Sequence, residues 1–242
     1  IRQSVHLKAI GGKVVFKKTI EAAPVITSAC SMLILEGIDI IQETLDNAIS
    51  VLEGCTRLIN CTISVNKHSA IRLYGKSIAE AEGCHFSKGY NPTVFLDDNS
   101  TMYLKNTTVS DSEMAGVYVD NSATCYIDEG CKFNQMANIG VVVQNKGQCL
   151  INKAEFHQAK YAAIDCSTSF DTTMVTNCIF RNCAQGIVSD KASFITVKNC
   201  QFERCDYSSL HAQEKGRILS IGNTFKDALG NMIVLANSYG VI

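Results

Sequence analysis

The sequence predicts an all-β protein, a right-handed parallel β-helix of about nine 23-residue coils with an N-terminal cap. Two recurring columns of apolar residues and a third recurring run predict this fold. The first column closes each "N/G-C-x-F/I" unit, and its members follow one another at intervals of 22 to 24 residues. They are Ile40, Ile63, Phe86, Val109, Phe133, Phe156, Phe180, Phe202 and Phe225.

The second column lies in short β-branched runs such as "GVYV" and "GVVV", which are typical of strands. Its members are Ile49, Ile71, Val94, Val117, Val141, Ile164, Ile187, Leu210 and Ile233. A third run, seen as "MYLKN", "CYIDEG" and "ITVKN", leads into each closing unit. One coil of a parallel β-helix needs three such strands. Neither the paired helices of ankyrin repeats nor the leucine pattern of leucine-rich repeats is present.

The first 30 residues fit these columns less well. We therefore predict a cap over residues 1–30, with "GGKVVFKKTI" as a hairpin or an entry strand and "APVITSAC" as an irregular first coil. A cap is expected because an open β edge invites aggregation. Residues 31–242 are predicted to form the coils of a single structural domain.

Composition excludes several classes of protein. With 46% hydrophobic residues in 242, the chain has enough apolar surface for one large core. Basic and acidic residues nearly cancel, at 22 and 23, so no nucleic-acid partner is expected. The apolar runs are too short for a membrane span, and no signal peptide is expected at the N-terminus.

The cysteines occupy a column two positions before the closing residue. Its members are Ile38, Cys61, Cys84, Thr107, Cys131, Ala154, Cys178, Cys200 and Asn223. Strand alternation points this column inward, where a free cysteine acts as a small hydrophobe. One cysteine per coil lacks the paired spacing of structural zinc, so we predict no metal and no cofactor. Disulfides between stacked cysteines stay open, because adjacent rungs lie within the permitted Cα distance.

A further column marks a bend in each coil. Asparagine and glycine share a tolerance of left-handed backbone, and they alternate at the position before the cysteine column. The members are Asn60, Gly83, Asn106, Gly130, Asn177, Asn199 and Gly222. We therefore expect a recurring turn there.

No catalytic constellation stands out, so we predict that the protein is not an enzyme. Glycoside hydrolysis needs paired carboxylates, and the adjacent pairs in the sequence are Asp97-Asp98 and Asp128-Glu129. The first pair precedes "NS", which is typical of a turn. The five histidines fall in different columns.

One outward row is unusually apolar and aromatic for a solvent face, and we call it the stripe. It runs through Ser50, Arg72, Phe95, Tyr118, Val142, Asp165, Val188, His211 and Val234. The candidate binding residues are Arg72, Phe95, Tyr118, Val142, Asp165 and His211. Either a loop or terminal segment covers the stripe, or it is a stacking platform for sugars or an anchor row for a protein partner.

Coils of the form "hxNCxFxxC", such as "KNCQFERC", together with "PVITSACSMLILEGIDI", resemble the carbohydrate-binding and sugar-hydrolase (CASH) type of β-helix repeat. Within that group they look most like the SHC-binding protein and Nessun Dorma family, with the F-box β-helix proteins next. The likeness covers residues 24–235. It implies a cytoplasmic, non-catalytic cytokinesis factor at the cleavage furrow or midbody, with centralspindlin as partner and affinity for glycans. The F-box relatives imply substrate recognition for ubiquitin ligation.

Three function classes therefore stay open. The first is a protein-binding scaffold in the cytoplasm, which buried free thiols favour. The second is a glycan-binding module. The third is a secreted or viral polysaccharide lyase or hydrolase, whose single catalytic residues on several coils would escape a motif search.

Overall fold

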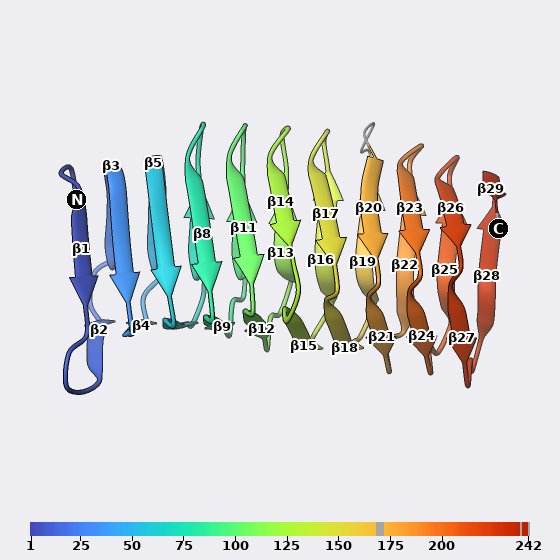
Figure 1. The fold of residues 1–242 in the computed structure, drawn as a ribbon, viewed down its shortest axis with the longest axis horizontal. Coiled ribbons are helices and arrows are strands. Elements are labelled where there is room, and N and C mark those ends of the chain that lie inside the picture. Colours follow the sequence, from blue (N-terminus) through green and yellow to red (C-terminus); the bar gives the residue numbers. More distant parts are fainter. Residues whose placement is uncertain (168–171, 238, 242) are drawn as a thin grey trace.

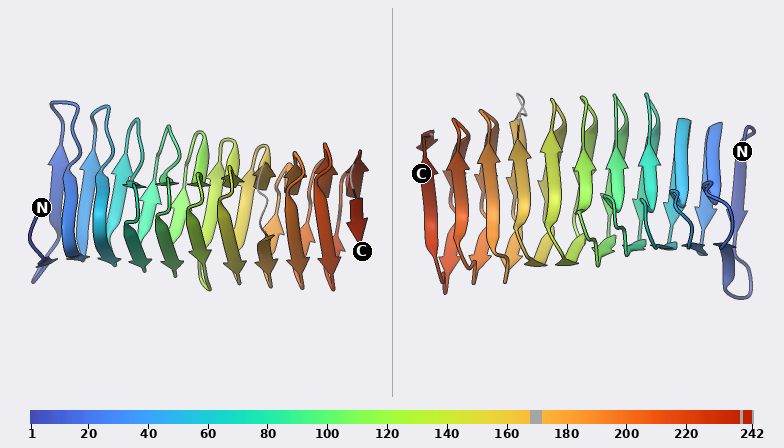
Figure 2. Two further views of the ribbon diagram at one scale, coloured as in Figure 1. Left: turned by 90° about the horizontal axis from the view of Figure 1, so that it is seen from above. Right: turned by 180° about the vertical axis from the view of Figure 1, so that it is seen from behind.

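The chain forms a rod of stacked coils with its two termini at opposite ends (Figures 1 and 2). The computed structural model describes residues 1–167, 172–237 and 239–241. Within these residues all elements are β-strands, and the ladders join each strand in parallel to its counterpart in the next coil. The predicted parallel β-helix is confirmed.

One face of the rod is a ten-stranded sheet that contains the closing column. Its strands are β2 (Val14–Lys18), β4 (Ile38–Gln42), β6 (Thr62–Val65), β9 (His85–Ser87), β12 (Thr108–Ser110), β15 (Lys132–Met136), β18 (Glu155–Ala159), β21 (Ile179–Arg181), β24 (Gln201–Glu203) and β27 (Thr224–Lys226). Their register aligns the whole predicted column, from Ile40 to Phe225.

The second sheet has 19 strands in two ladders. The ladder that bears the stripe contains β7 (Ile71–Leu73), β10 (Val94–Leu96), β13 (Ala115–Val119), β16 (Ile139–Gln144), β19 (Ala162–Ser167), β22 (Gln185–Asp190), β25 (Ser208–Gln213) and β28 (Asn231–Ala236). The other contains β1 (Val5–Lys8), β8 (Ile78–Glu82), β11 (Thr101–Lys105), β14 (Thr124–Ile127), β17 (Gln148–Asn152), β20 (Thr172–Thr176), β23 (Phe194–Lys198), β26 (Arg217–Ile221) and β29 (Tyr239–Val241). The long strands β3 (Ile26–Glu36) and β5 (Ile49–Ile59) run through both ladders and join them.

In the first coil, "GGKVVFKKTI" forms an entry strand, β2, which is one of the two predicted alternatives, and not a hairpin. β1 pairs in parallel with β3 in one sheet, and β2 pairs in parallel with β4 in the other, with Phe16 beside Ile40. The segment therefore stacks under the next coil, and its glycine pair links two faces of the rod instead of folding one strand onto the other. The division that we placed at residue 30 falls inside β3.

Stacked aromatic rings fill much of the core. From Phe133 to Phe225 the closing column forms a row of parallel phenylalanines whose centroids lie 4.6 to 5.4 Å apart. Phe156 and Phe180 are fully buried. Because each ring packs on the ring one coil away, the repeating residue fixes the register between coils.

The cysteine column points inward, as predicted, and three members of different residue type donate a hydrogen bond to a backbone carbonyl. The Cys178 thiol donates to the Thr176 carbonyl at 3.2 Å, and Thr107 Oγ1 donates to the Lys105 carbonyl at 2.9 Å. Asn223 Nδ2 likewise donates to the Val197 carbonyl at 2.9 Å. The Thr176 and Lys105 carbonyls also accept the Lys153 and Gly83 N–H groups of the preceding coil, so the side chain adds a second hydrogen bond to each. Threonine and asparagine can replace cysteine here because they too carry a donor.

The predicted bend column is confirmed by its backbone. Asn199 and Gly222 have φ angles of 54° and 62°, and Lys153, which stands in the same column, has 53°. A Cβ on Gly222 would lie 2.7 Å from Asn199 Oδ1. The Asn199 side chain thus occupies the space that a side chain at position 222 would need, which favours glycine at that position.

Candidate functional site

The stripe forms one continuous row along the rod. Strand pairing places Ser50 beside Arg72, Arg72 beside Phe95, and so on through every predicted member to Val234. The longer side chains are partly exposed, but Val142 and Val188 are only 8% and 1% exposed. Each valine is shorter than its neighbours in the row, so those neighbours shield it.

Arg72 ties together the N-terminal half of the stripe. Its guanidinium lies 4.4 Å from the centroid of Phe95 and 4.8 Å from that of Tyr74, and its Nη2 donates to Asp97 Oδ2 at 3.4 Å. Its Nε is buried without an acceptor in the described residues. The row therefore already holds one cation between aromatic rings and a carboxylate.

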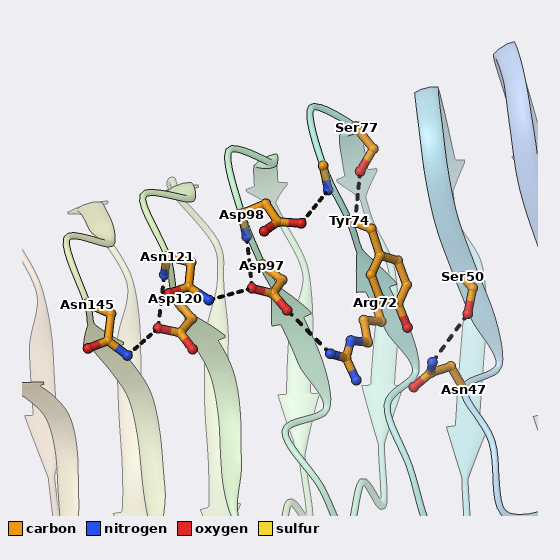
Figure 3. A network of polar contacts seen from close by, with 11 residues as sticks. Asn47, Ser50, Arg72, Tyr74, Ser77, Asp97, Asp98, Asp120, Asn121 and Asn145 are labelled. Atoms are coloured by element: carbon orange, nitrogen blue, oxygen red, sulfur yellow. Dashed lines mark hydrogen bonds and ion pairs between the residues drawn. The ribbon is translucent and has the colours of Figure 1, made fainter.

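The turns beside the stripe hold their aspartates by hydrogen bonds from asparagine side chains (Figure 3). Asn121 Nδ2 donates to Asp97 Oδ1 at 2.9 Å, and Asn145 Nδ2 donates to Asp120 Oδ1 at 2.8 Å. Burial opposes the charge of Asp97. However, hydrogen bonds from Asn121 and the Asp98 N–H, together with Arg72, lower the pKa of its carboxyl.

The Asp97-Asp98 pair belongs to a turn, as predicted. Asp98 has a φ of 57°, and its Oδ2 accepts a hydrogen bond from the Gly75 N–H at 3.1 Å. Both carboxylates serve the backbone and side chains of adjacent coils. They therefore do not face a common reacting position.

A small groove opens on the stripe at Phe95 and Tyr118. The two rings make a T-shaped contact with centroids 5.2 Å apart. The groove has a volume of about 250 Å³, and its lining is His68, Ser69, Arg72, Asn91, Pro92, Phe95, Met114, Tyr118 and Asp120. Burial raises the pKa of the Tyr118 phenol, and the charges of Asp120, Asp165 and Asp97 add to that effect. The groove thus combines aromatic surface with a negative field.

Asp165 dominates the electrostatics of the C-terminal half of the stripe. Its Oδ1 is buried and has no hydrogen-bond partner among the described residues. Burial and the nearby Asp190 raise its pKa to about 6, and Lys191 opposes this with a smaller effect. A carboxylate in such surroundings gains from a donor that a ligand brings.

His211 lies two rungs beyond Asp165, and Val188 separates the two. Its Nδ1 donates to Gln185 Oε1 at 2.8 Å, and burial lowers the pKa of the imidazole. Two rungs correspond to roughly 10 Å. The fold brings Asp165 and His211 onto one face, but it does not join them in an acid–base pair.

Sequence reasoning missed two other surfaces. An exposed apolar row follows the second ladder through Tyr103, Tyr126, Leu150 and Met174, and its two tyrosine rings stack 4.8 Å apart. In the third apolar run, exposed apolar residues alternate with buried ones, and this alternation in the sequence could have predicted the row. An open groove of about 830 Å³ follows the bend before the stripe strands, and its lining includes Asp111, Gln135, Gln158, Asn182, Asp206 and Tyr207.

All twelve cysteines are free, and eleven of them are buried. No cluster of three or more histidine, cysteine or acidic side chains suited to a metal ion occurs in the described part of the chain. The same residues include no helix long and apolar enough to cross a membrane.

Comparisons with known proteins agree with this geometry. The family described as "Right handed beta helix region" matches residues 30–129 and 115–242. Among solved structures, the Streptococcus pneumoniae surface protein and adhesin PfbA is similar, with a TM-score of 0.58 and 11% sequence identity. The match covers 99% of this chain and 87% of that chain. At this identity the likeness shows the fold alone.

A comparison with curated proteins gives no match. The narrower resemblance to CASH-type repeats and to the SHC-binding protein and Nessun Dorma family stays a prediction. The two family matches together extend from residue 30 to residue 242. The chain therefore belongs to the right-handed β-helix family.

Proposed function

We propose that the protein is a non-catalytic β-helix scaffold that binds a partner protein along the stripe. The observation that carries this proposal is the groove at Phe95 and Tyr118, where two half-buried rings are held side by side and bordered by Arg72 and Asp120. Aromatic anchors in a pocket with a charged rim are typical of protein interfaces.

The scaffold supports binding because its surface is already ordered. Phe95 and Tyr118 stand on adjacent rungs, fixed by parallel ladders on both sides, so little freedom remains to be lost on association. PfbA, which has a similar fold, is a surface protein and adhesin, so the fold accommodates a binding role. The separation of Asp165 from His211 favours binding over acid–base chemistry.

The test compares two pairs of substitutions. The stripe variant is Phe95→Ala with Tyr118→Ala. The control is Tyr103→Ala with Tyr126→Ala, which removes a second aromatic pair from another face. Proteins retained from dividing-cell extract are compared by mass spectrometry, with equal folding verified by circular dichroism. We expect a partner retained by the wild type and the control to be lost from the stripe variant. Retention by the stripe variant would refute the proposal.

The resemblance supplies the first partner to examine. We propose that the protein binds centralspindlin components in the cytoplasm, at the cleavage furrow or midbody. This assignment rests on the resemblance alone. Purified centralspindlin should bind the wild-type chain and lose affinity for the stripe variant. Absence of binding would discard this partner and leave the scaffold proposal standing.

A second candidate is glycan binding in the groove along the bend. Successive coils present the side chains of Gln135, Gln158 and Asn182 there, all exposed, beside Tyr207. A ladder of amides next to an aromatic ring suits sugar hydroxyls. An oligosaccharide array would reveal this activity, and Gln158→Ala with Tyr207→Ala should abolish it. Loss of glycan signal in the stripe variant instead would exclude the bend groove.

A further inference from the structure

Negative charge is concentrated along the stripe. The row itself carries Arg72 and Asp165, and the parallel row two residues farther along each strand carries Asp97, Asp120 and Asp190. Four carboxylates against one guanidinium leave an excess of three negative charges, although the whole chain has a net charge of only −1. Burial lowers the pKa of His211, which disfavours its charged form, and the charge of Asp190 opposes that effect. The described turns that follow the stripe strands carry four lysines, Lys76, Lys146, Lys191 and Lys215, and two further carboxylates, Asp98 and Glu214, and they lie at the rim.

Three of these carboxylates, Asp120, Asp165 and Asp190, form no ion pair in the described residues, and two of them bear on the proposed site. Asp120 lines the groove at Tyr118, where its Oδ1 accepts hydrogen bonds from Asn145 and the Asn121 N–H. Asp165 keeps a buried oxygen that has no donor among the residues that the structure describes. Asp97, by contrast, forms an ion pair with Arg72.

Arg72 shows what this surface accommodates. A guanidinium between Tyr74, Phe95 and Asp97 is held by ring faces and a carboxylate together. One rung farther on, Tyr118 and Asp120 present the same combination of ring and carboxylate in the groove that Arg72 also lines, but Arg72 pairs with Asp97, and Asp120 forms no ion pair in the described residues. A second cation at that position would repeat the arrangement.

We propose that the stripe binds a basic, extended segment of the partner protein, with one lysine or arginine beside Tyr118 and Asp120 and another beside Asp165. This inference rests on the proposed function and names the chemistry of the partner. Tyr118 and Asp165 are two rungs apart, roughly 10 Å, which is about three residues of an extended chain. Side chains on one face of an extended peptide repeat every two residues, roughly 7 Å, which is shorter than this distance. Lysine and arginine side chains are long enough to span the remainder.

Complementary charge favours a basic peptide over the other ligands. An acidic polysaccharide or peptide would add negative charge beside four carboxylates. A neutral glycan would donate hydroxyls to Asp165 but would leave the excess negative charge of the stripe unbalanced. A basic segment offsets this excess charge.

The experiment measures binding of defined peptides to the full 242-residue chain by fluorescence anisotropy. The probes are labelled Gly-Ser-Lys-Ser-Lys-Lys-Ser-Gly, the same peptide with glutamate for lysine, and a labelled neutral glucan oligosaccharide. We expect the lysine peptide alone to bind, and its affinity to fall about tenfold between low salt and 0.3 M salt. Asp165→Asn and Asp120→Asn should each weaken it about five- to tenfold, whereas Asp227→Asn, an exposed carboxylate on another face, should leave it unchanged.

The outcomes separate this inference from the proposed function. If the cellular partner is lost from the Phe95→Ala, Tyr118→Ala variant but binds the aspartate variants with unchanged affinity, the scaffold stands and the basic segment is wrong. If the partner binds the stripe variant as well as it binds the wild type, both fail. Binding of the glucan that depends on Asp165, or binding of the glutamate peptide, would also overturn the inference.

Discussion

At the scale of the residue, Asp165 lies where a valine would fit the row. Its neighbours in the stripe are Val142 and Val188, and the charged groups that bear on it are Asp190 and Lys191. A carboxylate with a buried, unpaired oxygen destabilises the folded chain when it is ionised. Binding a cationic group would offset that cost.

The pKa of Asp165 predicts a pH-dependent stability. Because the folded value of about 6 exceeds the ordinary value of 3.8, this group favours the folded state below about pH 4, and that contribution is lost as the pH rises to about 6. The loss amounts to roughly 2 to 3 kcal/mol. We expect Asp165→Asn to remove it and to raise the free energy of unfolding at pH 7.5 relative to wild type, but not at pH 4. Urea unfolding at both pH values measures this, with Asp227→Asn as control. Equal pH dependence in the wild type and Asp165→Asn would contradict the assignment.

Sequence periodicity located every member of the stripe, because strand alternation fixes which side chains share a face. It did not reveal that Val142 and Val188 are shielded, or that Asp165 Oδ1 has no donor within residues 1–167, 172–237 and 239–241. Those properties depend on the lengths of neighbouring side chains one coil away, which no single repeat specifies.

At the scale of the element, the stripe strands pack closely against the phenylalanine stack. Gly186 on β22 shows how close: a Cβ there would lie 2.7 Å from Phe202 Cε1 and would also meet the Ser209 carbonyl oxygen. The strand therefore needs a residue without a side chain at that point.

Gly186→Ala should destabilise the protein by about 1 to 3 kcal/mol, because the added methyl group forces the strand away from Phe202. Gly12→Ala is the matched control, since a Cβ on Gly12 meets nothing within 4 Å. Thermal unfolding followed by circular dichroism compares the two. A variant at Gly186 as stable as wild type would mean that β22 and β24 are farther apart than described.

The sequence predicted the three strands of each coil but not the role of the first segment. Phe16 precedes Ile40 by one period, yet the glycines at positions 11 and 12 resemble a hairpin turn. Whether this segment forms a hairpin depends on its pairing with β4, a strand that is distant in sequence. The local turn residues give no information about that pairing. The exposed row through Tyr103 and Tyr126 was missed because the third apolar run was used only to identify a strand.

At the scale of the whole molecule, the thiols form part of the core. Eleven of twelve cysteines are buried, and Cys55 is partly exposed. Burial raises the pKa of Cys131 to about 11 and that of Cys183 to about 12, which suppresses the reactive thiolate.

A thiol titration tests this arrangement. We expect about one rapidly reacting thiol in the native protein, Cys55, and all twelve after unfolding without reductant. A shortfall after unfolding, such as a disulfide between Cys178 and Cys200, would contradict the free-thiol core. It would also count against a cytoplasmic location, which remains a prediction.

The most direct test of the binding scaffold uses the aromatic residues on three faces of the rod as reporters. Phe95 and Tyr118 report on the stripe, Tyr103 and Tyr126 on the second ladder, and Tyr207 on the bend groove. Hydroxyl-radical footprinting with mass spectrometry compares their oxidation with and without the bound partner. We predict protection of Phe95 and Tyr118, with the other three unchanged. Protection of Tyr207 or of the Tyr103 and Tyr126 pair, with the stripe still oxidised, would contradict the account.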